Sequence, residues 1–188
     1  MLTPIAALWL PILVAAVLGF IASALMWTVM PHHKTDFQQI PDEENVLAML
    51  RAGGLKPGEY MFPYCASHAD QGTPEYVEKM KQGPMGTMIV MQNGLPSMAP
   101  MMVQQFVFFL VTTVLVAYIG AVTMEPGADY LKVFRVIGTA SILAYAGAHV
   151  PRSIWFQRPW ANSFKEVFDG VVYGLLTAGA FGWLWPAA

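Results

Sequence analysis

Two long stretches of this chain carry no charged side chain, and this restricts what the chain can fold into. No charged residue precedes Lys34, and none lies between Gln82 and Met124. Of the 188 residues, 56% are hydrophobic and only 12% are charged, whereas a soluble domain carries about 25% charged residues. This composition indicates an integral membrane protein before any motif is considered.

Four segments are long and apolar enough to cross a bilayer, which takes about 20 helical residues. We expect transmembrane helices at 5–30, 102–124, 130–151 and 163–186. A secretory signal peptide is the alternative for the first segment, but that segment lacks a basic start and its apolar run is too long. Pro151 marks the expected end of the third helix, because proline has no backbone N–H.

The last two predicted helices form a hairpin with small residues at every fourth position. Small residues at this spacing let helix backbones approach closely in lipid. The predicted contact residues are Ala140, Ala144 and Ala148 on the third helix and Gly170, Gly174, Ala178 and Gly182 on the fourth. Chance is the alternative, because membrane helices are generally rich in glycine. The second helix is rich in Phe and Val, which is typical of a lipid-facing helix.

Residues 31–100 form the polar part of the chain. Helix starts are indicated at Pro41-Asp42-Glu43-Glu44 and at Thr73-Pro74-Glu75, and strand composition occurs at 59–62 and 87–91. We therefore predict a mainly α membrane protein, with four transmembrane helices and a small α/β extramembrane module between helices one and two. So small a module has little core, and we expect it to rely on the membrane helices or on a partner.

Lys and Arg residues near the helix ends predict the topology. Arg152, Arg158 and Lys165 lie near the connection between the last two helices, on the same side as the 31–100 module. Cytoplasmic loops carry an excess of Lys and Arg. The rule therefore places the module in the cytoplasm and both termini outside.

Several short strings give the chain a family resemblance. They are Pro41-Asp42-Glu43, Gly58-Glu59-Tyr60-Met61-Phe62-Pro63, Gly83-Pro84-Met85-Gly86, and the closing pattern from His149-Val150-Pro151 through Ile154-Trp155-Phe156 to Asp169-Gly170. With them, most of the chain resembles a group of bacterial four-helix membrane proteins of unknown function. The resemblance implies a location in the bacterial inner membrane, and it transfers no activity or site residue.

Four ionisable residues flank the connection of the hairpin. His149 and Arg152 are three residues apart, as are Glu166 and Asp169, so each pair shares one side of a helix. The hairpin would bring the two pairs together at one membrane face. Ionisable groups at membrane depth are costly and often functional. We favour the alternative, an ion-pair cluster that fixes the hairpin, since such networks also occur without function.

A second candidate site is a set of soft metal ligands in the polar segment. Met61, Cys65 and His68 lie within eight residues, and further Met residues follow. Thioether, thiolate and imidazole suit Cu(I), but Met also fills apolar space and no repeated metal motif occurs. The adjacent His32 and His33 add little to this set. For a nucleophilic enzyme, nothing identifies a third group that would orient Cys65 and His68.

Composition narrows the function further. A net charge of −2 gives no nucleic-acid signature, and a single cysteine excludes an intramolecular disulfide framework. No motif identifies a cofactor. The leading hypothesis is a non-enzymatic structural or accessory subunit that binds a protein partner, or a second copy of itself, in the bilayer. Copper handling is the second hypothesis, and a small membrane enzyme or transporter is the third.

Overall fold

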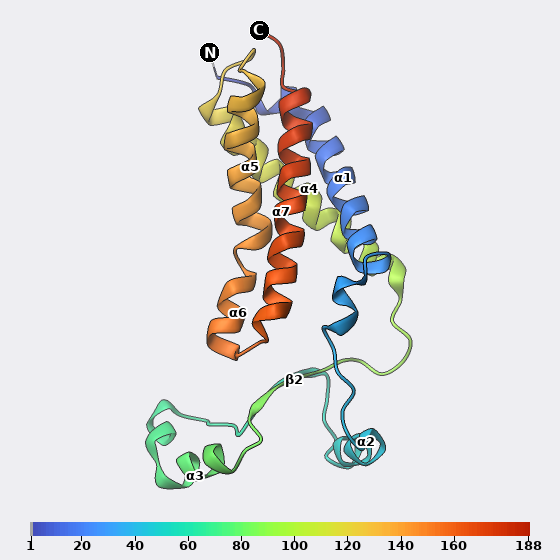
Figure 1. The fold of residues 1–188 in the computed structure, drawn as a ribbon, viewed down its shortest axis with the longest axis vertical. Coiled ribbons are helices and arrows are strands. Elements are labelled where there is room, and N and C mark those ends of the chain that lie inside the picture. The colour runs from blue at the N-terminus through green and yellow to red at the C-terminus, as the bar shows by residue number, and fades with distance from the viewer. Residues whose placement is uncertain (1) are drawn as a thin grey trace. The chain divides into compact units, whose positions relative to one another are not determined.

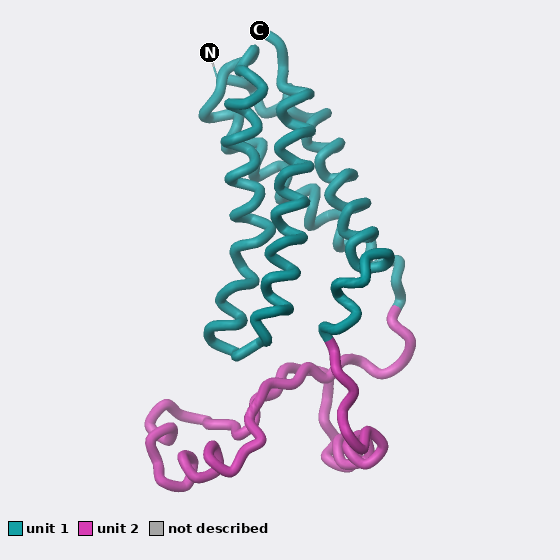
Figure 2. The backbone as a smooth tube through the Cα atoms, viewed as in Figure 1, with its two compact units in different colours: residues 1–36, 97–188 teal, residues 37–96 magenta. Residues whose placement is uncertain are grey.

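The structure is a computed structural model in which residues 2–188 are described. The chain divides into two compact units (Figure 2). One comprises residues 1–36 and 97–188 and is a bundle of helices, and the other comprises residues 37–96 and is the polar module.

Within the described residues, the bundle contains four long helices: α1 (Trp9–Thr28), α4 (Met98–Thr123), α5 (Tyr130–Ala146) and α7 (Trp160–Trp183) (Figure 1). Short helices complete it: the 3-10 helices η1 (Ile5–Leu8) and η2 (Pro31–Thr35) flank α1, and α6 (His149–Phe156) connects α5 to α7. The mainly helical fold is therefore confirmed.

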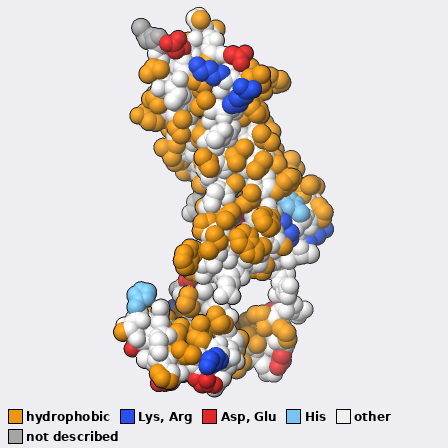
Figure 3. All heavy atoms as spheres, turned by 60° about the vertical axis from the view of Figure 1, so that its left-hand side comes forward, with side chains coloured by type: hydrophobic (Ala, Val, Ile, Leu, Met, Phe, Trp, Pro, Cys, Tyr) orange, Lys and Arg blue, Asp and Glu red, His pale blue; other side chains and the backbone are white. Residues whose placement is uncertain are grey.

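Three helical segments are long and apolar enough to cross a membrane: Ile5–Thr28, Met98–Thr123 and Tyr130–Phe156. They support a multi-pass membrane protein, as the sequence predicted. Helix α7 does not belong to this set, and its first half carries Lys165, Glu166 and Asp169. Figure 3 shows hydrophobic side chains over most of the visible face of the bundle, with charged side chains near its ends.

The segment predicted as the third helix, 130–151, lies within the span Tyr130–Phe156 and has a short interruption. Helix α5 ends at Ala146 and α6 begins at His149. In a continuous helix Pro151 would lack the bond to the carbonyl of Gly147, and its ring would clash there. After the break, Pro151 lies in the first turn of α6, where backbone N–H groups need no helical partner.

Helix α4 is only partly lipid-facing, which also differs from the prediction. Its Phe109 is fully buried and packs with Ala16, Tyr145 and Tyr173. Gly19 of α1 makes room for this ring, because a Cβ atom there would lie 2.6 Å from Phe109 Cδ1. The bulky residues of α4 thus divide between an exposed face and the centre of the bundle.

The hairpin of α5 and α7 is closely packed, through the predicted face of α7. A Cβ atom at Gly170 would lie 2.9 Å from the backbone of Ala146, and one at Gly174 would lie 2.5 Å from Ile142 Cγ1. A Cβ atom at Gly182 would lie 2.6 Å from the ring of Tyr130. The glycines of α7 therefore allow the two backbones to approach each other.

The face of α5 differs from the prediction. Ala144 and Ala148 are exposed and Ala140 is half-buried, whereas Ala178 of α7 lies opposite Gly138. Spacing identifies a stripe of small residues but not which side of the helix faces inward. Burial of bulky apolar side chains decides the side here, since Val133 and Ile137 are fully buried.

Hydrogen bonds connect chain segments at each end of the bundle. At one end, Thr3 N donates to Met124 O at 3.1 Å and Gly127 N donates to Pro186 O at 2.8 Å. At the other end, Asn162 Nδ2 of α7 donates to the carbonyl of Asp36, which follows η2, at 3.0 Å. Because Thr3 and Pro186 both contact the turn between α4 and α5, the two termini lie at the first of these ends (Figure 1).

The module contains α2 (Glu43–Ala52), β1 (Gly58–Phe62), η3 (His68–Gly72), α3 (Pro74–Gln82) and β2 (Gly86–Val90). The two strands pair in antiparallel register, with Tyr60 opposite Met88. Thr73 caps α3 by accepting from Tyr76 N at 3.4 Å. The small α/β composition is as predicted, but no residue of 37–96 is buried. The module has no closed core of its own.

Candidate functional site

A buried cluster of ionisable side chains joins η2 to α7. Pro31 begins η2 directly after α1, so that both histidines of η2 reach Asp169. His32 Nε2 lies 2.9 Å from Asp169 Oδ1, and His33 Nε2 lies 2.8 Å from Asp169 Oδ2. Asp169 is only 3% exposed and His33 only 8%. One buried carboxylate is thus shared by two imidazoles.

The ring of His33 is fixed on its other side as well. Its Nδ1 lies 2.6 Å from Asp36 Oδ2, and Lys165 Nζ donates to Asp36 Oδ1 at 2.6 Å. The indole of Trp27 stacks on the imidazole, with ring centroids 3.9 Å apart and planes 6° apart. These contacts fix both the position and the orientation of His33.

The network is balanced in charge. Burial opposes the charged form of His33, but hydrogen bonds with Asp169 and Asp36 outweigh it and raise the pKa of His33 above 6.5. Burial also opposes the charged form of Asp36, but Lys165 and His33 outweigh it and lower the pKa of that carboxyl group. In the metal-free protein, His33 is therefore protonated over a wider pH range than an ordinary histidine.

The same residues have the geometry of a metal site. One ligand atom each from His32, His33 and Asp169 lie within 4.8 Å of one another. Two imidazoles and one carboxylate are a ligand set for divalent transition metals. Metal-binding histidines usually donate their other ring N–H to a carboxylate, which is the arrangement of His33 Nδ1 and Asp36. Asp36 thus orients the imidazole of His33 without itself being one of the three ligands.

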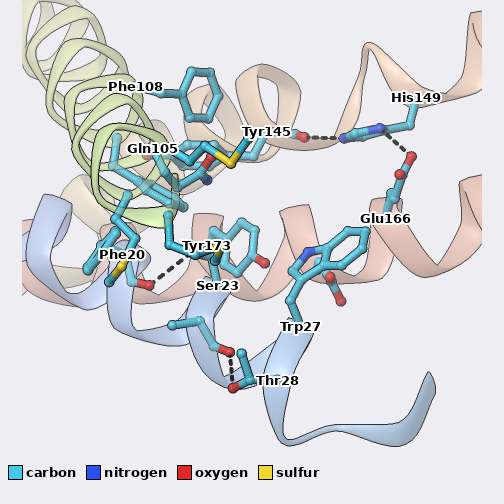
Figure 4. A pocket seen from close by; sticks show the side chains of 16 residues that line it. Phe20, Ser23, Trp27, Thr28, Gln105, Phe108, Tyr145, His149, Glu166 and Tyr173 are labelled. Carbon is cyan, nitrogen blue, oxygen red and sulfur yellow. Dashed lines mark hydrogen bonds and ion pairs between the residues drawn. The ribbon is translucent and has the colours of Figure 1, made fainter. Parts of the chain in front are cut away.

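A cavity of about 530 Å³ adjoins Asp169 within the bundle (Figure 4). Its walls are largely apolar and include Phe20, Trp27 and Phe108, together with Met residues of α4. The ionisable lining groups come from α5, α6 and α7, and Ser23, Thr28 and Gln105 of α1 and α4 add further polar groups; the ionisable ones are Tyr145, Tyr173, His149, Glu166 and Asp169. The cavity therefore combines an apolar chamber with a polar end beside the histidine cluster.

A second ion-pair network borders the cavity. His149 Nδ1 lies 2.7 Å from Glu166 Oε2, and Arg158 Nη2 donates to Glu166 Oε1 at 2.8 Å. The second guanidinium nitrogen of Arg158 also contacts Glu166. His149 Nε2 lies 3.2 Å from the carbonyl oxygen of Tyr145. This network connects α6, the loop after it and α7.

The predicted cluster of His149, Arg152, Glu166 and Asp169 is therefore divided between two networks. His149 and Glu166 are paired, but Asp169 contacts the histidines of η2 instead. Arg152 is exposed and forms no ion pair with any described residue. Ser153 of α6 also faces α7, and its Oγ lies 2.7 Å from Ser163 Oγ. This orientation of α6 directs Arg152 away from the carboxylates.

The predicted copper ligands are not enclosed. Met61 and His68 are exposed, and the Cys65 thiol donates to the Ser67 carbonyl oxygen at 3.0 Å. His32 and His33, which the sequence did not single out, are candidate metal ligands in the structure. The available signal was a histidine pair directly after an apolar helix, together with a single Asp in the apolar part of another.

Comparison of this chain with known proteins found no matching family, no similar curated protein and no similar solved structure.

Proposed function

We propose that this chain is a metal-binding membrane protein that holds a divalent transition metal ion at His32, His33 and Asp169. The observation that carries the proposal is the convergence of three ligand atoms within 4.8 Å, in a buried position. Three protein ligands leave coordination positions open, as in catalytic metal sites. The cavity beside Asp169 provides room for a further ligand of the ion.

A purely structural ion-pair network is the competing explanation. Such a network uses its buried donors and acceptors almost completely. Here Nδ1 of His32 is buried and has no hydrogen-bond partner among the described residues. The carboxylate of Asp36 behind His33 is also the arrangement that orients a metal-binding imidazole. The first observation counts against a fully satisfied ion-pair network, and the second favours a metal site.

Metal analysis of the purified protein tests this proposal. The full chain would be purified in mild detergent, loaded with Zn²⁺ or Co²⁺, desalted, and measured by plasma mass spectrometry. We expect one ion per chain, and its loss in Asp169→Asn and in His33→Gln. The matched control is His68→Gln in the exposed part of the module, which should keep the ion. Equal metal content in all folded variants would refute the site.

We also propose that α7 is the fourth transmembrane helix. It has 24 residues, and Gly170, Gly174 and Gly182 hold it against α5 along most of its length. The charges in its first half are neutralised within the bundle, since Asp169 and Glu166 both have cationic or imidazole partners. The family resemblance supports a bacterial inner membrane, and the Lys and Arg distribution supports a cytoplasmic module.

A second candidate function is that of an accessory subunit whose module binds a protein partner. It is favoured by the module's open structure, in which no residue is buried and large apolar side chains such as Phe37, Met91 and Leu95 are more than three-quarters exposed. Exposed apolar surface of this kind often marks an interaction site. Amide hydrogen exchange over 37–96 should then be slower in native membranes than in purified protein. Equal exchange would contradict partner binding.

A further inference from the structure

We infer that the cavity beside Asp169 binds a neutral, lipid-soluble molecule with hydrogen-bond-accepting oxygens, of which a substituted quinone is the representative. This site goes beyond the proposed metal site, although the two share Asp169. Three features of the cavity support this class of ligand: two unpartnered hydroxyl groups, an apolar chamber, and a polar end whose charges are already neutralised.

Two tyrosine hydroxyls lack a partner. Tyr145 is 5% exposed and Tyr173 is 8% exposed, and both line the cavity. By distance and angle, neither hydroxyl forms a hydrogen bond with a described residue, although the Thr177 side chain lies near the Tyr145 hydroxyl and the Asp169 carboxylate lies near the Tyr173 hydroxyl. Buried hydroxyls are rarely left unused, because the lost hydrogen bond to water is not replaced. A ligand with acceptor oxygens would satisfy both.

The two rings are held in place before any ligand arrives. Their centroids are 6.0 Å apart with planes at 90°, and each also packs against the buried ring of Phe109, at 5.4 Å. Figure 4 shows both side chains beside the chamber that Phe108 and Phe20 border. The hydroxyls therefore have fixed positions, which lowers the entropic cost of binding.

The chamber suits a molecule that arrives through the lipid. Its volume of about 530 Å³ lies within the range of small-molecule sites. Met98, Met101 and Met102 of α4 line it and are also about half exposed or more on the surface of the bundle. Since α4 is apolar enough to cross a membrane, the exposure of these residues favours entry from the lipid.

The charges at the polar end favour a neutral head group. Asp169 is paired with two histidines, and Glu166 is paired with Arg158 and His149. An organic cation in the cavity would have to displace these partners, and an anion would meet two carboxylates. The buried groups that remain unmatched include two hydroxyl donors, and carbonyl oxygens are their natural acceptors.

Binding of a decyl-substituted dimethoxy-methyl-benzoquinone to the full chain in mild detergent tests the inference. We expect saturable binding, weakened about two- to tenfold by Tyr145→Phe and by Tyr173→Phe, because each variant loses one hydrogen bond and keeps its ring. The matched control is Tyr118→Phe on the exposed face of α4, which should bind as the wild type does.

Two further arms make the outcome decisive. Decylbenzene, which lacks carbonyl oxygens, should bind more weakly than the quinone, and chelator-treated protein should still bind the quinone. The second arm separates this inference from the metal proposal. The inference would be overturned if binding did not saturate, or if the double variant Tyr145→Phe/Tyr173→Phe bound the quinone as tightly as the wild type does. Tighter binding of decyl phosphate than of the quinone would also overturn it.

Discussion

His33 contacts two carboxylates, and its metal affinity should therefore depend on pH in a defined direction. Burial opposes its charge, yet hydrogen bonds with Asp169 and Asp36 raise its pKa above 6.5. A metal ion binds only the deprotonated imidazole. Below the raised pKa, protons compete with the ion, so affinity should increase with pH by up to about tenfold per unit. Zn²⁺ competition titrations between roughly pH 6 and pH 8 would measure this, and an affinity independent of pH would contradict it.

Asp36 is predicted to increase the affinity for the metal ion although it is not a ligand. Its carboxylate orients His33 and is kept charged by Lys165, which together with His33 lowers its pKa despite burial. Asp36→Asn should weaken Zn²⁺ binding by about 10–100-fold, the usual cost of losing such an outer partner. Asp70→Asn, at an exposed position of the module, serves as the control. Equal affinities of the two variants would remove Asp36 from the site.

At the scale of elements, the contact of α5 and α7 predicts that two Gly→Ala substitutions on α7 change the stability of the bundle in different directions. A Cβ atom at Gly170 would lie 2.9 Å from the backbone of Ala146, whereas one at Gly179 would meet nothing within 4 Å. Gly170→Ala should therefore destabilise the bundle by about 1–3 kcal/mol. Gly179→Ala should be neutral or stabilising by up to about 1 kcal/mol, because Ala favours helix. Thermal unfolding in mild detergent would compare them, and equal melting temperatures would disprove close packing.

These elements also show how far the sequence could predict the structure. The contact face of α7 was predictable, because glycines at every fourth position are needed where backbones meet. The face of α5 was not, since Ala140 and Ala144 have the same spacing as the true contacts. Hairpin geometry predicted that His149 and Glu166 would lie near each other, but not which ion pairs would form. The contact of Asp169 with His32 and His33 did not follow from that geometry, because it depends on a short 3-10 helix returning to the bundle after α1.

That return of the chain also moves the boundary between the two units. The sequence placed the module at 31–100, whereas the structure assigns 31–36 and 97–100 to the bundle. Polar composition suggested an extramembrane segment, but His33 and Asp36 are tied to α7 by hydrogen bonds. Two of the three proposed metal ligands, His32 and His33, thus lie in a stretch whose composition resembles a loop. Local composition could not reveal a contact between residues more than a hundred positions apart.

At the scale of the whole molecule, the topology follows from which residues lie at each end of the bundle. The turn between α4 and α5 lies with the C-terminal segment, since Gly127 N donates to Pro186 O. Arg152, Arg158 and Lys165 lie toward the opposite end, where Lys165 contacts Asp36. Because Lys and Arg accumulate on the cytoplasmic side, we propose that this second end, and the module that follows Asp36, are cytoplasmic.

Labelling of intact bacterial cells with a membrane-impermeant maleimide tests this arrangement and the crossing of α7 together. The native Cys65 in the module should stay unlabelled. In a Cys65→Ser background, Ala128→Cys and Ala188→Cys should both be labelled, because an even number of spans places these positions on one side. If α7 did not cross, Ala188→Cys would behave as Cys65 does while Ala128→Cys remained labelled. Labelling of all three in detergent-solubilised membranes provides the accessibility control, and labelling of Cys65 alone in intact cells would invert the topology.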